Sequence, residues 1–226
     1  MTTAHRATSP RRPARPTGGK GYTDEEAKIV LGHALAYRPK QGKTRQTTET
    51  APTAAAKKWT PFLCAYTGAR IAEMTQLRKE DVREHNGIRY LRITPEAGSV
   101  KTSEYRDVPL HRHLIELGFL DFVEASANGP LFYAEGGTRG GKRHPSKNVA
   151  DQVAEWVRGL GIVPPGVKPN HAWRHRLKTV GREIGVDPRV LDAIQGHAAR
   201  TAGDDYGDVT LKARAVTIEK FPEYSL

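Results

Sequence analysis

Residues 88–109 carry the one stretch of this chain with a β-strand pattern, and it lies between segments with helical periodicity. Asn86-Gly87, a strong turn signal, precedes the segment IRYLRITPE, and the segment SVKTSEYRDVPL continues the pattern as further short strands. A single small group of strands in an otherwise helical sequence predicts an α+β fold that is mainly α-helical, with one small antiparallel β-sheet.

Helices are expected on both sides of this sheet. The first begins after Thr23, a good N-cap, and Glu26 completes a capping box within an acidic first turn. Residues 54–82 are expected to form two helices with a break around Thr67-Gly68, after a polar loop over residues 38–53. Further helical patterns cover residues 113–126, 148–161, 169–185, 187–196 and 211–221.

The N-terminal segment differs in composition from the rest of the chain. Residues 1–20 are rich in Pro, Arg, Ser, Thr and Gly and have almost no large apolar side chain. They are therefore expected to form a disordered basic arm or a linker remnant. Residues 21–226 are expected to form the ordered domain.

Composition also narrows the classes of function. The formal net charge of +11 favours a polyanionic partner, because each neutralised phosphate releases counterions. No apolar run approaches the roughly 20 residues that a membrane span needs, and the N-terminus lacks the apolar core of a signal peptide. The single cysteine, Cys64, excludes an internal disulfide and metal sites built from several thiolates. It is expected to be buried and fits a reducing, cytoplasmic setting.

Two basic residues stand out near the predicted sheet, although neither identifies a function alone. Arg70 lies just after Gly68 at the start of an apolar-rich helix, where a charge needs a partner; an exposed arginine is the alternative. Lys101 lies in the turn-rich middle of the sheet region and has the local context of an ordinary hairpin lysine.

The segment PNHAWRH gathers His171, Arg174 and His175 around Trp173 at the start of a predicted helix. His171 and Arg174 are three residues apart and share a helix face, whereas His175 points elsewhere. A helix N-terminus beneath these side chains would reinforce an anion site. The alternative is a basic helix start that is merely solvated.

The last two candidates lie further along the chain. His197 follows Gly196 at a predicted helix C-terminus, where an imidazolium is favoured, and a capping role is the alternative. Tyr206 lies in the polar segment GDDYGD, where a tyrosine is a packing anchor, a surface residue or a nucleophile toward phosphorus. The chain has no P-loop, no HExxH motif and no GxSxG elbow.

Taken in order, these weak signals form a recognisable series. The series begins with TGAR, continues with a hairpin lysine followed by RDVPL and with HAWRH, and ends with GH and a tyrosine nine residues after that histidine. In this order the motifs resemble the tyrosine recombinase (phage integrase) family, and the resemblance covers residues 22–222. The resemblance implies an active site made of Arg70, Lys101, His171, Arg174, His197 and Tyr206. It also implies that Glu73, three residues after the first arginine, orients His171 or an arginine.

The chain departs from the family pattern at three places. Trp173 stands where the family usually has leucine, and IQGH stands where it usually has LGH. The chain also has no room for the N-terminal core-binding domain that family members normally carry. Residues 21–226 therefore look like the catalytic domain alone, either naturally short or cut from a longer protein.

The resemblance implies a mechanism that needs neither metal, cofactor nor ATP. Tyr206 would attack a scissile DNA phosphodiester, form a 3′-phosphotyrosyl link and release a 5′-hydroxyl. Arg70 and Arg174 would give forked donors to the phosphate, and His197 would add a donor. Lys101 would protonate the leaving oxygen, and His171 would accept the tyrosine proton or orient the phosphate.

The resemblance also implies partners. Double-stranded DNA would be the substrate, held by a salt-sensitive interface. A homotetramer on DNA is expected, with residues 209–221 as a partner-binding helix whose apolar face is Leu211, Ala215 and Ile218; the competing interpretation is that this helix folds back on its own domain. The protein is expected in the cytoplasm, encoded by a bacterium or phage and associated with the nucleoid. The residues expected to contact DNA outside the active site are Arg139, Lys142, Arg143 and His175.

Three other functions stay open. A type IB topoisomerase uses closely related chemistry, although the small hairpin and the IQGH segment favour a recombinase. A DNA-binding module without catalysis would not need all six catalytic residue types. A nonenzymatic basic structural protein would not need Tyr206 in this arrangement.

Overall fold

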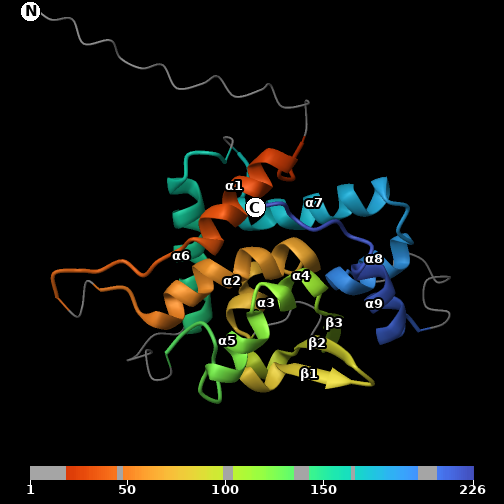
Figure 1. Ribbon diagram of the computed structural model, residues 1–226, viewed down its shortest axis with the longest axis horizontal. Coiled ribbons are helices and arrows are strands. Elements are labelled where there is room, and N and C mark those ends of the chain that lie inside the picture. Colours follow the sequence, from red (N-terminus) through yellow and green to blue (C-terminus); the bar gives the residue numbers. More distant parts are fainter. Residues whose placement is uncertain (1–18, 45–47, 99–103, 135–142, 164–165, 198–207) are drawn as a thin grey trace, which may run out of the picture.

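The structure is a computed structural model that describes residues 19–44, 48–98, 104–134, 143–163, 166–197 and 208–226. The described residues form a mainly helical fold with a three-stranded antiparallel sheet at one end of the molecule (Figure 1). The fold class predicted from the sequence is therefore confirmed. None of the helices in these ranges combines the length and apolar character that crossing a bilayer requires.

The helices and strands follow one another in the order expected from the sequence, with the sheet in the first half of the chain. The helices are α1 (Asp24–Leu35), α2 (Ala51–Thr67), α3 (Ile71–Thr75), α4 (Arg112–Glu116), α5 (Phe119–Ala125), α6 (Pro145–Gly159), α7 (Pro169–Glu183), α8 (Pro188–Gln195) and α9 (Leu211–Ile218). The strands are β1 (Val82–His85), β2 (Ile88–Ile93) and β3 (Arg106–Pro109), and the short 3-10 helices are η1 (Lys79–Asp81) and η2 (Pro95–Ala97).

Helix α2 forms the centre of the molecule. It packs against α1, α3, α6 and α7, and its side chains Trp59, Phe62, Leu63 and Tyr66 are almost fully buried (Figure 1). Thr50 caps its start, and its end is set by Gly68, which adopts the left-handed conformation at φ 59°. That turn directs the chain into α3, so the end of a rigid, buried helix fixes where α3 begins.

The sheet has the strand order β1-β2-β3. The β1–β2 turn is formed by Asn86 and Gly87 with positive φ angles of 49° and 76°, as the sequence signal predicted. Arg92 on β2 lies opposite Asp107 on β3, and the two form a forked ion pair with both N–O distances at 2.8 Å. Strand β3 contacts α8 and α9, so its first residue lies close to these helices.

Three predicted boundaries are wrong. The second helix expected within residues 54–82 ends at Thr75, and η1 and the start of β1 take the place of its last turns. Residues 113–126 form two helices, α4 and α5, because Gly118 between them has a φ of 86° that a continuous helix cannot contain. Helix α2 begins at Ala51, inside the predicted loop, because Thr50 provides its cap. The prediction for Cys64 is confirmed, since this side chain is fully buried in the core.

The C-terminal segment folds back on its own domain. Helix α9 packs against β3 and α8, and Ile218 and Phe221 are buried there (Figure 1). The main-chain oxygen of Phe221 lies 3.0 Å from Nε2 of His111, and Arg112 pairs with Glu219 and Glu223. In the single chain, α9 therefore has the position that the competing interpretation gives, packed against its own domain and not against a partner.

Candidate active site

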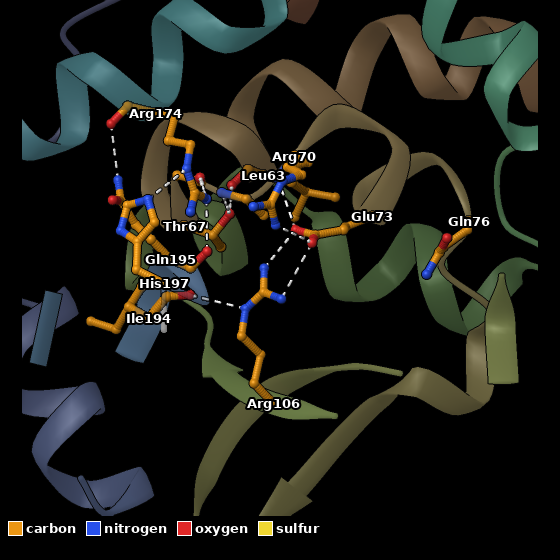
Figure 2. Close-up of polar contacts among 12 residues, drawn as sticks. Leu63, Thr67, Arg70, Glu73, Gln76, Arg106, Arg174, Ile194, Gln195 and His197 are labelled. Atoms are coloured by element: carbon orange, nitrogen blue, oxygen red, sulfur yellow. Dashed lines mark hydrogen bonds and ion pairs between the residues drawn. The ribbon is translucent and has the colours of Figure 1, made fainter. Parts of the chain in front are cut away.

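Five of the predicted site residues meet where the turn after α2, the start of α3, the start of α7 and the end of α8 come together (Figure 2). They are Arg70, Glu73, His171, Arg174 and His197. The predicted residues Lys101, Tyr206, Arg139 and Lys142 lie outside the described residues.

Arg174 is the most constrained member of this group, with only 5% of its surface exposed. Its Nη1 donates to the main-chain oxygens of Gly68 (2.8 Å) and Gln195 (2.7 Å), and its Nε donates to Nε2 of His197 (3.1 Å). Its buried Nη2 has no hydrogen-bond partner among the described residues. The guanidinium is thus fixed on two edges and keeps one NH₂ group available.

Burial decides the electrostatics of Arg174. Burial, followed by the charge of nearby Arg70, lowers the pKa of Arg174 to about 10. The side chain therefore remains a cation at neutral pH, but one that has lost much of its hydration. A charge in this condition binds an anion more strongly than an exposed arginine does.

Arg70 is the N-cap residue of α3, and its side chain is 30% exposed. Its Nη1 donates to Oε1 of Glu73 at 2.9 Å, while its main-chain N–H donates to Oε2 of the same carboxylate at 2.9 Å. Its Nε and Nη2 have no hydrogen-bond partner in the described part of the chain. Arg70 also lines a cleft of about 360 Å³ together with Ile71, Ala154, Arg158, Lys168, Pro169, Asn170 and His171.

Glu73 orients arginines rather than His171. Its carboxylate is buried and accepts hydrogen bonds from Arg70 and from Arg106 at the start of β3, with Nη2 of Arg106 at 2.6 Å from Oε2 (Figure 2). Burial alone would raise the pKa of Glu73, but the charge and hydrogen bonds of Arg106, and then those of Arg70, lower it below its usual value. Glu73 is therefore a carboxylate at neutral pH.

The expectation that His175 points away from His171 is wrong. The two side chains lie one turn apart on the same face of α7, with ring centroids 4.9 Å from each other, because residues four apart in a helix share a face. Burial, then the charge of His175 and that of Arg174, lower the pKa of His171; burial, then Lys20 and Arg174, lower the pKa of His175. Both imidazoles are therefore neutral at neutral pH, and a neutral imidazole can accept a proton.

The expectation that the helix end favours a charged His197 is wrong. Its Nδ1 lies 2.8 Å from Oδ1 of Asp192, and its Nε2 accepts the hydrogen bond from Nε of Arg174. Burial is the largest influence and lowers the pKa of His197, and the charge of Arg174 lowers it further against the opposing effect of Asp192. The partners assign the proton to Nδ1, so donation to a phosphate from Nε2 requires a second proton.

The structure adds residues that sequence reasoning did not single out. Arg106 carried no local signal beyond its place in the RDVPL segment, because its partners are distant in sequence. Arg158 lies on a predicted helix and Lys168 just before another, where basic residues are ordinarily solvated. Arg143, a predicted DNA contact, is half-exposed and pairs with Asp151 at 2.7 Å. Gln195, at the usual leucine position, is fully buried and donates to the main-chain oxygen of Arg174 at 2.9 Å.

The arrangement is suited to binding one oxyanion. Arg70 and Arg174 lie side by side (Figure 2), and the buried Nη2 of Arg174 has no hydrogen-bond partner among the described residues. The neutral His171 lines the same cleft as Arg70. Within the described ranges, no group of three His, Cys, Asp or Glu side chains is placed to hold a metal ion. The arginines are placed to stabilise negative charge on a bound phosphate.

Comparisons with known proteins identify a family for this chain. The model of the "Phage integrase family" matches residues 43–211. Tyrosine recombinase XerA from Pyrococcus furiosus is 26% identical over 154 residues, which are 68% of this chain and 50% of that protein. The chain thus spans about half the length of this curated relative.

Two solved structures show a similar fold. The integrase from mycobacterium phage Brujita has a TM-score of 0.56 and 22% sequence identity, covering 95% of this chain and 61% of that one. The XerH site-specific recombinase bound to difH substrate, in a pre-cleavage complex, has a TM-score of 0.51 and 18% identity, covering 85% of this chain and 52% of that one.

Proposed function

The chain belongs to the phage integrase family, whose model covers residues 43–211, and on this premise we propose that it is the catalytic domain of a site-specific DNA recombinase or integrase. It would cleave and rejoin double-stranded DNA through a covalent 3′-phosphotyrosyl intermediate. Residues 21–226 would form this catalytic domain. The names of two relatives, a tyrosine recombinase and a site-specific recombinase bound to its difH substrate, support DNA as the substrate.

The observation that carries the proposal is the unpartnered Nη2 of the buried Arg174. A buried N–H group without an acceptor costs free energy, and proteins rarely leave one unless a ligand completes it. A phosphate oxygen would be that acceptor, and a second oxygen would reach the free donors of neighbouring Arg70. Two forked guanidinium groups match the geometry of a phosphodiester.

The remaining steps follow from the motif positions. The phenolic oxygen of Tyr206 would form a bond to phosphorus while the bond from phosphorus to the 5′-oxygen breaks. Neutral His171 would accept the tyrosine proton, and Lys101 would give a proton to the leaving oxygen. Because the phosphotyrosyl bond conserves the phosphodiester energy, rejoining would need neither ATP nor a metal ion.

DNA would extend beyond the active site along the basic cleft. Arg158 and Lys168 line that cleft, and they would join the predicted contacts Arg143 and His175 in binding phosphates on either side of the scissile one. The predicted contacts Arg139 and Lys142 would add to this interface. Each phosphate contact should make binding more sensitive to salt.

A homotetramer on DNA is the assembly that we infer for the complete recombinase. Helix α9 would then leave its own domain and pack against a neighbouring subunit, and this would first expose Ile218 and Phe221. Hydrogen exchange on the isolated protein tests whether α9 can leave its own domain. Rapid exchange across residues 209–221 is expected if the helix detaches easily, whereas strong protection in a proven monomer would rule it out.

A plasmid assay tests the proposed function. The wild-type chain is expected to nick supercoiled plasmid DNA and to remain covalently bound to it, while Tyr206→Phe should bind DNA without nicking it. Relaxation of supercoils by a monomer, with no recombinant product, would indicate a type IB topoisomerase. Binding without any nick in the wild type would indicate a module without catalysis.

A further inference from the structure

Arg106 is the first residue of β3, and it connects three segments of the candidate active site. Only 8% of its surface is exposed. Its Nη2 and Nη1 donate to the two oxygens of Glu73 at 2.6 Å and 3.4 Å, and its Nε donates to the main-chain oxygen of Ile194 at 3.2 Å. Figure 2 shows the side chain rising from β3 between Glu73 and the end of α8.

The two arginines share the carboxylate of Glu73 evenly. Oε1 accepts from Nη1 of Arg70 and from Nη1 of Arg106, while Oε2 accepts from the main-chain N–H of Arg70 and from Nη2 of Arg106. Arg106 therefore occupies the edge of the carboxylate that a forked Arg70–Glu73 pair would need. As a result, only one nitrogen of the Arg70 guanidinium is bound to Glu73.

The chain is built to bring Arg106 close to the end of α8. Gly196 ends this helix with a φ of 65°, and a Cβ atom at that position would lie 2.8 Å from Cζ of Arg106. A side chain here would displace the guanidinium. The absence of a side chain thus allows Arg106 to contact the main chain of Ile194, two residues before Gly196 and three before His197.

The charges favour a positioning role over a simple structural ion pair. Glu73 is one carboxylate near Arg70, Arg106 and Arg174, and Asp192, which also acts on Arg174, pairs with Lys178, so positive charges outnumber carboxylates in this group. A pair that served only to join the sheet to the helices would need one arginine. The additional cations make sense where an anion binds next to them.

We propose that Arg106 is a positioning residue for DNA cleavage, which fixes Glu73 so that Arg70 keeps its free donors for the scissile phosphate. Through the main chain of Ile194, Arg106 also holds the end of α8, and with it His197, beside Arg174. Arg106 itself would touch no substrate. The inference rests on the proposed function as a DNA strand transferase.

Removal of Arg106 should change the geometry of Arg70. In Arg106→Gln, each oxygen of Glu73 loses one donor and keeps the one from Arg70, so the Arg70 guanidinium should turn to form a forked pair with the carboxylate. The rate of covalent adduct formation at saturating DNA should fall about 10²-fold, as expected for a small misplacement of a reacting group. The DNA concentration at half-saturation should change little. Arg106→Lys should restore part of the rate, because a lysine can still pair with Glu73.

The experiment uses the full chain and supercoiled plasmid DNA as the probe. Adduct is quantified after an SDS quench over a range of DNA concentrations, and the unfolding free energy is measured in urea. The Nε–Hε signal of Arg70 in ¹H–¹⁵N spectra reports the position of its guanidinium without any need for activity. The expected result is a shifted Arg70 signal and a slow adduct step in Arg106→Gln.

Arg78→Gln is the matched control. Arg78 holds the fully buried Asp81 with Nε at 3.0 Å and Nη2 at 2.7 Å, in the same i,i+3 arrangement as Arg70 and Glu73 but outside the site. This variant should lose stability and keep the wild-type adduct rate once folded. If Arg106→Gln behaved in the same way, or if the Arg70 signal did not move, Arg106 would be structural only.

Two further outcomes separate the inference from the function on which it rests. If Arg106→Gln does not fold, Arg106→Lys decides. A lysine can pair with Glu73 but cannot also reach the main chain of Ile194, so a partial loss of adduct rate and a shifted Arg70 signal are expected, and wild-type behaviour in both would overturn the inference. If the wild type forms no adduct at all, the proposed function fails. The Arg70 signal then still shows whether Arg106 fixes the guanidinium.

Discussion

Arg174 donates to three protein acceptors and keeps one buried NH₂ group without a partner. In Arg174→Lys, the charge remains, but a lysine cannot reach Gly68, Gln195 and His197 together and has no planar fork for the phosphate. Adduct formation should fall by about 10²-fold or more, the usual effect of losing one transition-state donor. The unfolding free energy should fall by about 1–3 kcal/mol, because buried carbonyl oxygens lose their donors.

Both quantities can be measured on the same preparation. Adduct formation on plasmid DNA gives the first, and urea unfolding followed by tryptophan fluorescence gives the second. Near-normal adduct formation by folded Arg174→Lys would remove Arg174 from the active site.

The histidines predict how stability depends on pH. Burial is the largest cause that lowers the pKa values of His111, His171, His175 and His197 below those of the unfolded chain. Above about pH 6.5, neither state binds protons at these groups, so they have no effect. Below it, the unfolded chain binds more protons than the folded chain, so stability should fall as the pH falls.

Urea unfolding at pH 7.5, 6.5 and 5.5 measures this dependence. The urea concentration at the unfolding midpoint should be lowest at pH 5.5. Adduct formation should also be slower at pH 5.5, because His171 becomes less available as a proton acceptor. A midpoint that rises between pH 7.5 and 5.5 would show that these imidazoles are not held neutral by the fold.

Among the elements, the turn between α2 and α3 controls the geometry of the site. At Gly68, a Cβ atom would clash with Nε2 of Gln195 and lie 2.8 Å from Cδ2 of Leu177, and the φ of 59° is left-handed. Gly68→Ala should therefore combine backbone strain of about 1–3 kcal/mol with a further cost of similar size for overpacking.

Gly87→Ala separates these two costs. Gly87 in the β1–β2 turn also has a positive φ of 76°, but a Cβ atom there would meet nothing within 4 Å. It should therefore show the backbone strain alone, and urea unfolding should give the larger loss for Gly68→Ala. Equal losses would mean that the approach of this turn to α8 is not tight.

Local signals predicted the elements where the local sequence determines the conformation. The capping box of Thr23 and Glu26 and the turn at Asn86-Gly87 are both present as predicted. The helical pattern across residues 113–126 concealed the break at Gly118, because a glycine leaves the hydrophobic period intact while it changes the backbone. Periodicity identifies which side chains are buried and says less about where a helix stops.

The site was predictable as a set of residues but not as a set of contacts. The order of the motifs along the chain identified Arg70, His171, Arg174 and His197, which the structure brings together. The role of Arg106 was not predictable, because its pairing with Glu73 spans 33 residues and its contact with Ile194 spans 88. The protonation of His197 likewise depends on Asp192 and Arg174, whose positions only the folded chain provides.

At the scale of the whole molecule, the cationic site is assembled from elements that are far apart in the sequence. They are the start of α3, the start of β3, the start of α7 and the end of α8 (Figure 1). The helices bury α2 and hold the arginines in place, and the sheet supplies Arg106. Such an arrangement would preorganise the proposed phosphate site, so that arginine donors stabilise the charge that develops on phosphorus.

The central claim is that this site serves one nucleophile, Tyr206, among the eight tyrosines of the chain. An unperturbed phenol has a pKa of about 10, so it needs a proton acceptor and a cationic field of the kind that His171, Arg70 and Arg174 offer. The most direct measurement is mass spectrometry of the peptide–DNA adduct trapped on nicked duplex DNA, with Tyr206→Phe as the control. The predicted result is DNA attached through a 3′-phosphate to the peptide that contains Tyr206, and no adduct in the control. An adduct on another tyrosine, or a link through a 5′-phosphate, would contradict the account.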